Sequence, residues 1–200
     1  MNFVKTYVSL LGLLTYANAF NEFEHEQFDE PKFLNDKPEL LGFIPGTVFD
    51  LDKFKLQVPY SSSGSFTSGT PIEIKQPELK SYQKANLFYG DTDLAGGNYM
   101  VMRTPCKGLT TSGSEHPRVE FHELAEWKGA DSTKHTISAT YTVHKVAAVS
   151  KRTVIMQIFD NDAYHLAEFF AESGKGLYFY VFEKDGSHTT YMIDSNWAVG

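Results

Sequence analysis

The sequence predicts an all-β fold, a β-sandwich or jelly roll built from several short strands. Its runs of β-branched and aromatic residues mostly alternate apolar with polar side chains, as strands with one buried face do. Gly, Ser, Asp and Pro punctuate these runs, and no segment has the period of a helix longer than two turns. The 16 Phe, 11 Tyr and 2 Trp of this 200-residue chain provide apolar surface for one core. A disordered chain is therefore excluded.

The expected strands follow one another at short intervals from residue 54 onward. In chain order they are FKLQV (54–58), YMVM (99–102), RVEFHEL (118–124), TISATYTVHKV (136–146), TVIMQIF (153–159), LAEFF (166–170) and LYFYVFE (177–183). The stretch SSSGSFTSGT (61–70) is expected to be a loop. The sequence KDGS (184–187) stands between LYFYVFE and HTTYMI, which predicts a hairpin turn.

The N-terminus has the features of a secretory signal peptide. Lys5 precedes a short apolar run over residues 7–16, and an A-x-A cleavage site ends the segment 1–19. The run is short for a membrane span, although a retained anchor helix is the alternative. We therefore predict a signal peptide over 1–19 and a secreted protein. An acidic irregular leader is expected over 20–45, followed by one domain over 46–200.

Composition and missing motifs exclude several function classes. The formal charge of −7 argues against a general nucleic-acid binder, which carries a basic face. The sequence has no G-x-S-x-G, P-loop or dinucleotide fingerprint. His135, His144 and His165 lack the spacing of a metal site. The single cysteine, Cys106, is expected to be a small buried residue or to have a partner outside this chain.

The run RVEFHE carries a row of polar groups on one face of a predicted strand. Because successive side chains point to opposite faces, Val119 and Phe121 are expected in the core. Arg118, Glu120 and His122 then share the other face. An arginine, a carboxylate and an imidazole in one row offer a charge clamp, an orienting group and a titratable base. An ordinary solvated outer face with a cross-strand salt bridge is the alternative.

The run TVIMQIF places a single amide among hydrophobic side chains. Ile155, Gln157 and Phe159 are expected on one face, and the residues between them on the other. The amide of Gln157 is either satisfied by a neighbouring backbone group or serves as a neutral donor to a ligand. Alternation alone does not decide between these two readings.

Four segments together resemble a known family. They are FDLDKFKLQVP (49–59), IEIKQPELKSY (72–82), MVMRTPCKGLTTSGSEHPRVEFHE (100–123) and VIMQIFDND (154–162). In order and rough spacing they are similar to the alginate-lyase type of polysaccharide lyase, family 7, and to its relatives that cut glucuronan. The Thr-Ser-Gly-Ser-x-x-Pro-Arg-x-Glu piece is the most specific part, and the resemblance runs from about Phe49 to Val199.

The resemblance implies a concanavalin-like β-jelly roll with its substrate groove on the concave sheet. It also implies β-elimination of a polyuronate, without metal or organic cofactor. In such a reaction the substrate carboxylate is first neutralised, a base removes the C5 proton, and an acid protonates the O4 leaving group. The family pattern assigns the neutralising role to Arg118 and Gln157, with Glu120 orienting the arginine.

This sequence departs from the family pattern at three places. His122 stands where the family has an arginine, and Phe159 stands where it has a histidine. The hypothesis is that His122 takes over the role of base or carboxylate contact, because histidine accepts a proton near neutral pH. The family's C-terminal tyrosine motif does not occur before Gly200. We therefore expect the jelly roll to lack its last strands, with Tyr164 as an alternative acid.

The remaining candidates concern the substrate and the rival functions. Arg103, Lys107 and His116 surround the loop 110–114 and are expected to form a basic rim for an anionic polymer, with scattered surface charge as the alternative. The predicted function is a secreted, monomeric polyuronate lyase whose partner is an anionic polysaccharide. It needs no nucleic acid, no cofactor and no membrane after signal cleavage. The rivals are a non-catalytic carbohydrate-binding jelly roll and, as the weaker reading, a glycoside hydrolase.

Overall fold

The computed structural model describes residues 4–8, 42–112, 114–127, 134–160 and 165–200. In these ranges the chain forms ten strands and two short 3-10 turns, η1 (Pro45–Thr47) and η2 (Glu78–Ser81). The strands are β1 (Val4–Val8), β2 (Phe54–Val58), β3 (Ile72–Ile74), β4 (Phe88–Thr92), β5 (Asn98–Met102), β6 (Glu120–Glu123), β7 (Arg152–Asp160), β8 (His165–Glu172), β9 (Gly176–Phe182) and β10 (His188–Asp194). The all-β prediction is confirmed.

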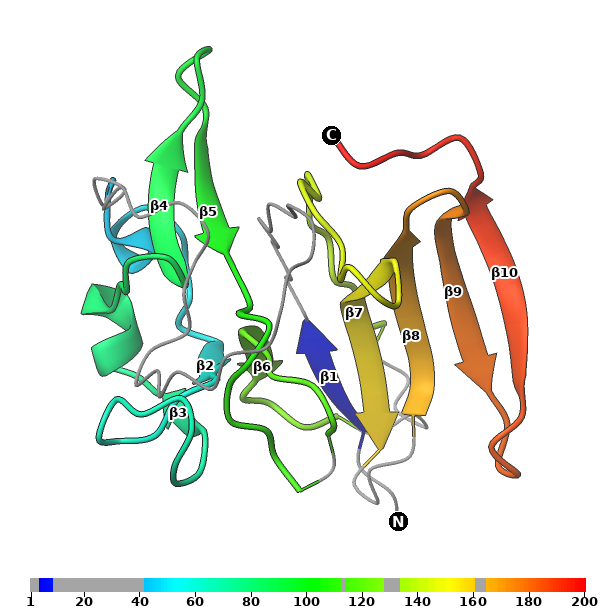
Figure 1. Ribbon diagram of the computed structural model, residues 1–200, viewed down its shortest axis with the longest axis horizontal. Helices are drawn as coiled ribbons and strands as arrows, with labels where there is room; N and C mark the ends of the chain where they lie inside the picture. The colour runs from blue at the N-terminus through cyan, green and yellow to red at the C-terminus, as the bar shows by residue number, and fades with distance from the viewer. Residues whose placement is uncertain (1–3, 9–41, 113, 128–133, 161–164) are drawn as a thin grey trace, which may run out of the picture.

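Two antiparallel sheets make up the fold. The larger has eight strands in the order β10-β9-β8-β7-β1-β6-β2-β3, and the smaller is the β4–β5 hairpin. Strands β7 to β10 follow one another in the chain and in the sheet, while β6, β2 and β3 lie at the other end (Figure 1). This arrangement of antiparallel sheets is jelly-roll-like, as the sequence predicts.

Most expected strands are present, but one is not. The segment 136–146 forms no strand, so that prediction is wrong. Val143 and Val146 are instead buried against Ala171 of β8, so the segment covers the back of the sheet without joining it. Its alternation reflects this one-sided burial, which does not require a partner strand.

The strands β3 and β4 were not expected from the sequence. Strand β4 contains Gly90, which has low strand propensity. A Cβ at this position would lie 2.3 Å from a ring atom of Phe43, so glycine is required by the close approach of the two segments.

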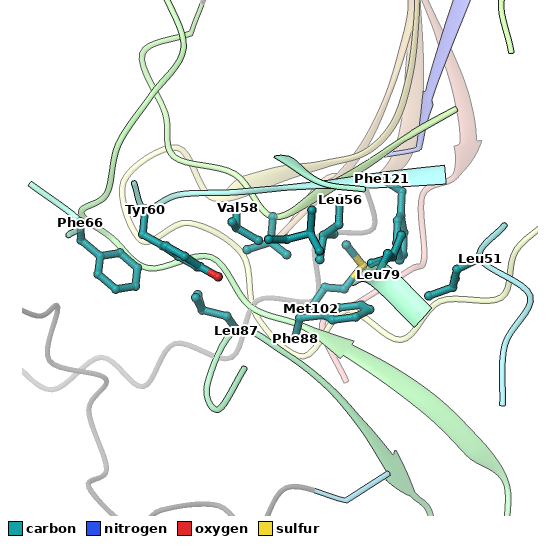
Figure 2. Packing of buried hydrophobic residues seen from close by; sticks show 12 residues of the cluster. Leu51, Leu56, Val58, Tyr60, Phe66, Leu79, Leu87, Phe88, Met102 and Phe121 are labelled. Carbon is teal, nitrogen blue, oxygen red and sulfur yellow. The ribbon is translucent and has the colours of Figure 1, made fainter. Parts of the chain in front are cut away.

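The main core lies between the β2–β6 part of the large sheet and the β4–β5 hairpin. Leu56 and Val58 of β2, Phe88 of β4 and Met102 of β5 are at most 1% exposed (Figure 2). Phe121 of β6 packs edge-on against Phe88, with ring centroids 5.7 Å apart. The core therefore fixes one face of β6 and determines which of its side chains face the other way.

The turn predictions are confirmed. The stretch 61–70 contains turns and bends and no strand. Between β9 and β10, the Glu183 N–H donates to the Ser187 carbonyl over 2.8 Å, and Gly186 adopts a φ of +82°. The expectation that Cys106 is buried is wrong, because the thiol is exposed on a bend after β5; a partner outside this chain stays a prediction.

Strand β1 lies between β6 and β7 in the large sheet. Tyr7 pairs with His122 of β6 on one side and with Gln157 of β7 on the other. The two halves of the sheet are joined through this strand (Figure 1). Residues 4–8 thus occupy the middle of the sheet, although the sequence assigns them to a signal peptide.

The predicted domain boundaries stay predictions. Residues 9–41, which include most of the predicted signal peptide over 1–19 and of the leader over 20–45, lie outside the described residues. In the ranges that the structure describes, no helix has the length and apolar character needed to cross a bilayer.

Candidate functional site

A buried carboxylate, Glu120, lies at the centre of the candidate site. Its side chain is fully buried and takes three polar partners. The Arg118 Nη1 donates to Oε2 over 3.1 Å, and the His122 Nε2 lies 3.1 Å from the same oxygen. The Gln157 Nε2 donates to Oε1. The structure therefore brings together the four residues that the sequence singled out from two distant segments.

Strand alternation explains the β6 half of this cluster. Val119 and Phe121 are 0% and 2% exposed and belong to the main core. Glu120 and His122 point to the other face, as predicted, but at 0% and 7% exposure they are not solvated. The alternative of an ordinary solvated outer face therefore does not hold for these two residues. Arg118, which precedes the strand, is half-buried, with its side chain 25% exposed.

The β7 half depends on an irregularity in the strand. The register shifts between Val154 and Met156, and Ile155 packs against the Val143–Val146–Ala171 cluster behind the sheet. The prediction that Ile155 shares a face with Gln157 is therefore wrong, because a bulge interrupts the alternation there. Gln157 still lies on the same face as Glu120, and its amide reaches across β1 to that carboxylate.

The environment of Glu120 favours its ionised form. Burial raises the pKa of a carboxyl group, but the hydrogen bond and charge of His122, the charge of Arg118 and the amide of Gln157 act in the other direction. Together they hold the pKa of Glu120 below its usual range. The carboxylate therefore stays negative and keeps its donors in place.

This shift predicts an acid-sensitive fold. A carboxyl group whose pKa is lower in the folded than in the unfolded protein stabilises the fold fully at pH values above its unfolded pKa, about 4.3 for glutamate. This stabilisation is lost as the pH falls through the folded-state pKa. We expect the free energy of unfolding, measured by urea denaturation, to decrease below about pH 4. Glu120→Gln should flatten this dependence. A variant profile that parallels the wild-type profile would contradict the assigned role of the carboxylate.

A second carboxylate, Glu73 of β3, lies on the far side of His122. The His122 Nδ1 is 3.8 Å from Glu73 Oε1, and the same oxygen pairs with Lys55 Nζ at 2.6 Å. Lys75 adds a contact of 3.4 Å to the other oxygen. Burial raises the pKa of Glu73. The hydrogen bond and charge of Lys55 and the charge of His122 lower it by more, so the pKa lies below its usual value.

Sequence reasoning missed three polar residues beside the site. Lys55 and Gln57 of β2 pair in register with His122 and Glu120, and Gln57 also pairs with Glu73. Gln57 is 4% exposed, and its Nε2 has no hydrogen-bond partner among the described residues. Alternation in FKLQV places Lys55 and Gln57 on one face of the strand. The sequence does not show that this face lies beside the polar face of β6.

The other predicted site residues lie apart from this cluster. Arg103 is 8% exposed and donates from Nη1 to Asn86 Oδ1 over 3.1 Å. Lys107 and His116 are exposed, so they are the members of the predicted basic rim that solvent can reach. That rim stays a prediction. Tyr164 lies outside the described residues.

One hollow in the described structure is on the core side of β6 and does not belong to the site. Phe54 and Phe121 line it together with part of the segment 137–139. In the described ranges, no group of three or more His, Cys, Asp or Glu side chains is arranged to hold a metal ion.

The cluster can bind and polarise a carboxylate ligand. One buried anion holds a guanidinium and an amide, both hydrogen-bond donors, and orients an imidazole through Nε2. Donors fixed in this way need no reorganisation when a ligand develops negative charge. The Nδ1 of His122 lies 3.8 Å from Oε1 of Glu73, so the imidazole stands between two carboxylates.

Comparison with known proteins identifies the family. Neither the curated proteins nor the solved structures provide a match to the chain. The model of the alginate lyase family matches residues 49–198, which span the main core and all four residues of the cluster. By this match over three quarters of its length, the chain belongs to the alginate lyase family.

Proposed function

We propose that this protein is a secreted polysaccharide lyase that cleaves a polyuronate, alginate or a glucuronan-like polymer, by β-elimination. The family match supports the lyase class. The single observation that carries the proposal is the convergence of Arg118, Gln157 and His122 on the buried Glu120. This arrangement supplies carboxylate-binding donors and a proton acceptor in one place.

The proposed reaction begins with the substrate carboxylate. An ionised carboxylate resists removal of the neighbouring C5 proton, because negative charge builds up beside it. Arg118 and Gln157 donate hydrogen bonds to the carboxylate and stabilise this charge. Glu120 holds both donors in place without contacting the sugar itself.

His122 then acts as the base. Glu120 positions the imidazole through Nε2, and the imidazole accepts the C5 proton. The C5–H electron pair forms the C4=C5 double bond, and the C4–O4 electron pair moves onto O4, which takes up a proton from a general acid. The products are an unsaturated uronate at one new end and a free hydroxyl at the other.

The reaction is tested by its chromophore. Wild-type protein is incubated with alginate and with glucuronan while absorbance is followed at about 235 nm, which reports the double bond formed after proton abstraction. A rise with either polymer supports the proposal. Binding without absorbance would favour a carbohydrate-binding module, and new reducing ends without absorbance would favour a hydrolase.

Replacing His122 by alanine is expected to lower kcat by about 100-fold or more, because a positioned base contributes about that much. Circular dichroism should show a folded protein, since Arg118 and Gln157 still bind Glu120. His144→Ala, at an exposed position, is the control for loss of an imidazole and should keep its activity. Near-wild-type kcat in His122→Ala would rule out this histidine as the base.

A further inference from the structure

A bulge in the large sheet brings His165 to the same face as Gln157. In β7, Ile158 pairs with Ala167, but the next residue, Phe159, pairs with His165, so Leu166 is an extra residue in β8. Without this bulge, alternation along β8 would place His165 on the face opposite Glu168. Bulges re-aim side chains in this way, and they are frequent beside active sites.

The ring of His165 is oriented by a carboxylate and by two aromatic rings. Its Nδ1 lies 2.6 Å from Glu168 Oε1, a distance typical of a strong, charge-assisted hydrogen bond. The ring centroids of Phe159 and Phe182 lie 4.2 Å and 5.4 Å from that of the imidazole. The side chain is nevertheless 43% exposed, so the imidazole is held in place and remains accessible.

This pair lies directly beside the candidate site. Glu168 is the register partner of Gln157, so the two side chains lie on the same face of neighbouring strands. Gln157 lies on β7. On one side of β7 come β1 and then β6, which carries His122; on the other side comes β8, which carries His165 (Figure 1). Two imidazoles, each held by a buried or partly buried carboxylate, flank the amide.

The proposed reaction needs two proton-transfer groups. One removes the C5 proton, and the other supplies a proton to O4 as the C4–O4 bond breaks. Glu120 and His122 form the first pair. Glu168 and His165 repeat this composition, a carboxylate paired with one ring nitrogen of an imidazole.

We infer that His165, oriented by Glu168, is the general acid that protonates the O4 leaving group; this rests on the proposed lyase function. The imidazolium donates its Nε2 proton to O4 while the C4–O4 electron pair moves onto that oxygen. Glu168 stays ionised and holds the Nδ1–H, and His165 returns to its charged form by taking a proton from water. His122 in turn releases the C5 proton to water, so proton and charge are balanced over one turnover.

The test separates acid catalysis from other roles by changing the leaving group. His165→Gln and His165→Asn are assayed on a polyuronate and on a uronide that carries a nitrophenyl ether at C4. A sugar hydroxyl leaves only with a proton, whereas a nitrophenolate leaves without one. We expect kcat to fall by about 100-fold on the polyuronate and to stay within about threefold of wild type on the nitrophenyl ether.

His144→Gln is the control and should match wild type on both substrates. Equal losses on both substrates, or no loss on the polyuronate, would overturn the acid role while leaving the lyase function intact. If wild-type protein forms the unsaturated product from neither substrate, the proposed function fails and the inference fails with it. Both His165 variants should fold, because the residue is exposed and outside the core; circular dichroism checks this.

Discussion

Replacing Arg118 by alanine is expected to lower kcat by about 1,000-fold, a loss at the upper end of what removing one preorganised donor costs. The guanidinium is hydrogen-bonded to Glu120 and its side chain is 25% exposed; in the proposed reaction it binds the substrate carboxylate. As charge moves toward that carboxylate in the transition state, the arginine stabilises it more strongly than in the ground state. The effect should therefore appear in kcat more than in KM.

Arg118→Lys is the matched variant for this experiment. Lysine keeps the positive charge but lacks the planar fork that binds a carboxylate through two parallel hydrogen bonds. We expect an intermediate kcat, with the same fold by circular dichroism, because the wild-type side chain is outside the main core. A rise in KM with unchanged kcat in Arg118→Ala would show that the arginine only binds substrate and does not stabilise the transition state.

Replacing Glu120 by alanine is expected to remove both activity and stability. The variant leaves His122 and Gln157 without their buried acceptor and places the charge of Arg118 beside an empty site. Removing one partner of a buried ionic cluster costs about 3 kcal/mol of unfolding free energy. Because Arg118, His122 and Gln157 all lose their orientation, we also expect kcat to fall by at least about 1,000-fold.

Glu120→Gln separates the shape of this side chain from its charge. Glutamine fills the same volume and can accept from one donor, so the loss of unfolding free energy measured in urea should be smaller than in the alanine variant. The activity should still fall, because the neutral amide no longer holds a guanidinium and an imidazole together. In a double-mutant cycle, Glu120→Ala and Gln157→Ala should be strongly non-additive in kcat. Additive effects would show that the two residues act independently.

Alternation in the sequence predicted the β6 half of the site correctly. It placed Val119 and Phe121 in the core and aligned Arg118, Glu120 and His122, because a strand with one face in the core has no freedom in its side-chain directions. It did not predict the burial of Glu120. That burial depends on neighbouring strands, which come from elsewhere in the chain.

The errors have a common physical cause. Segment 136–146 has the alternation of a strand because it is buried on one side, but pairing also needs a free strand edge beside it. Ile155 and His165 are turned by bulges, which arise from the fit between two strands and leave no mark in the sequence of either one. Local patterns therefore predict which side chains are buried more reliably than where irregular strands direct them.

The order of strands in the large sheet determines how the site forms during folding. Strands β7 to β10 are joined as consecutive hairpins, so their contacts are local and form early. Contacts between β6 and β7, such as that of Glu120 with Gln157, join segments far apart in the chain, and their loop-closure cost delays them. Gln157 and His165 are therefore positioned when strands β7 to β10 form, and β6, which carries Glu120, packs beside them later. Substitutions in the Glu120 cluster should therefore mainly accelerate unfolding and leave the folding rate nearly unchanged.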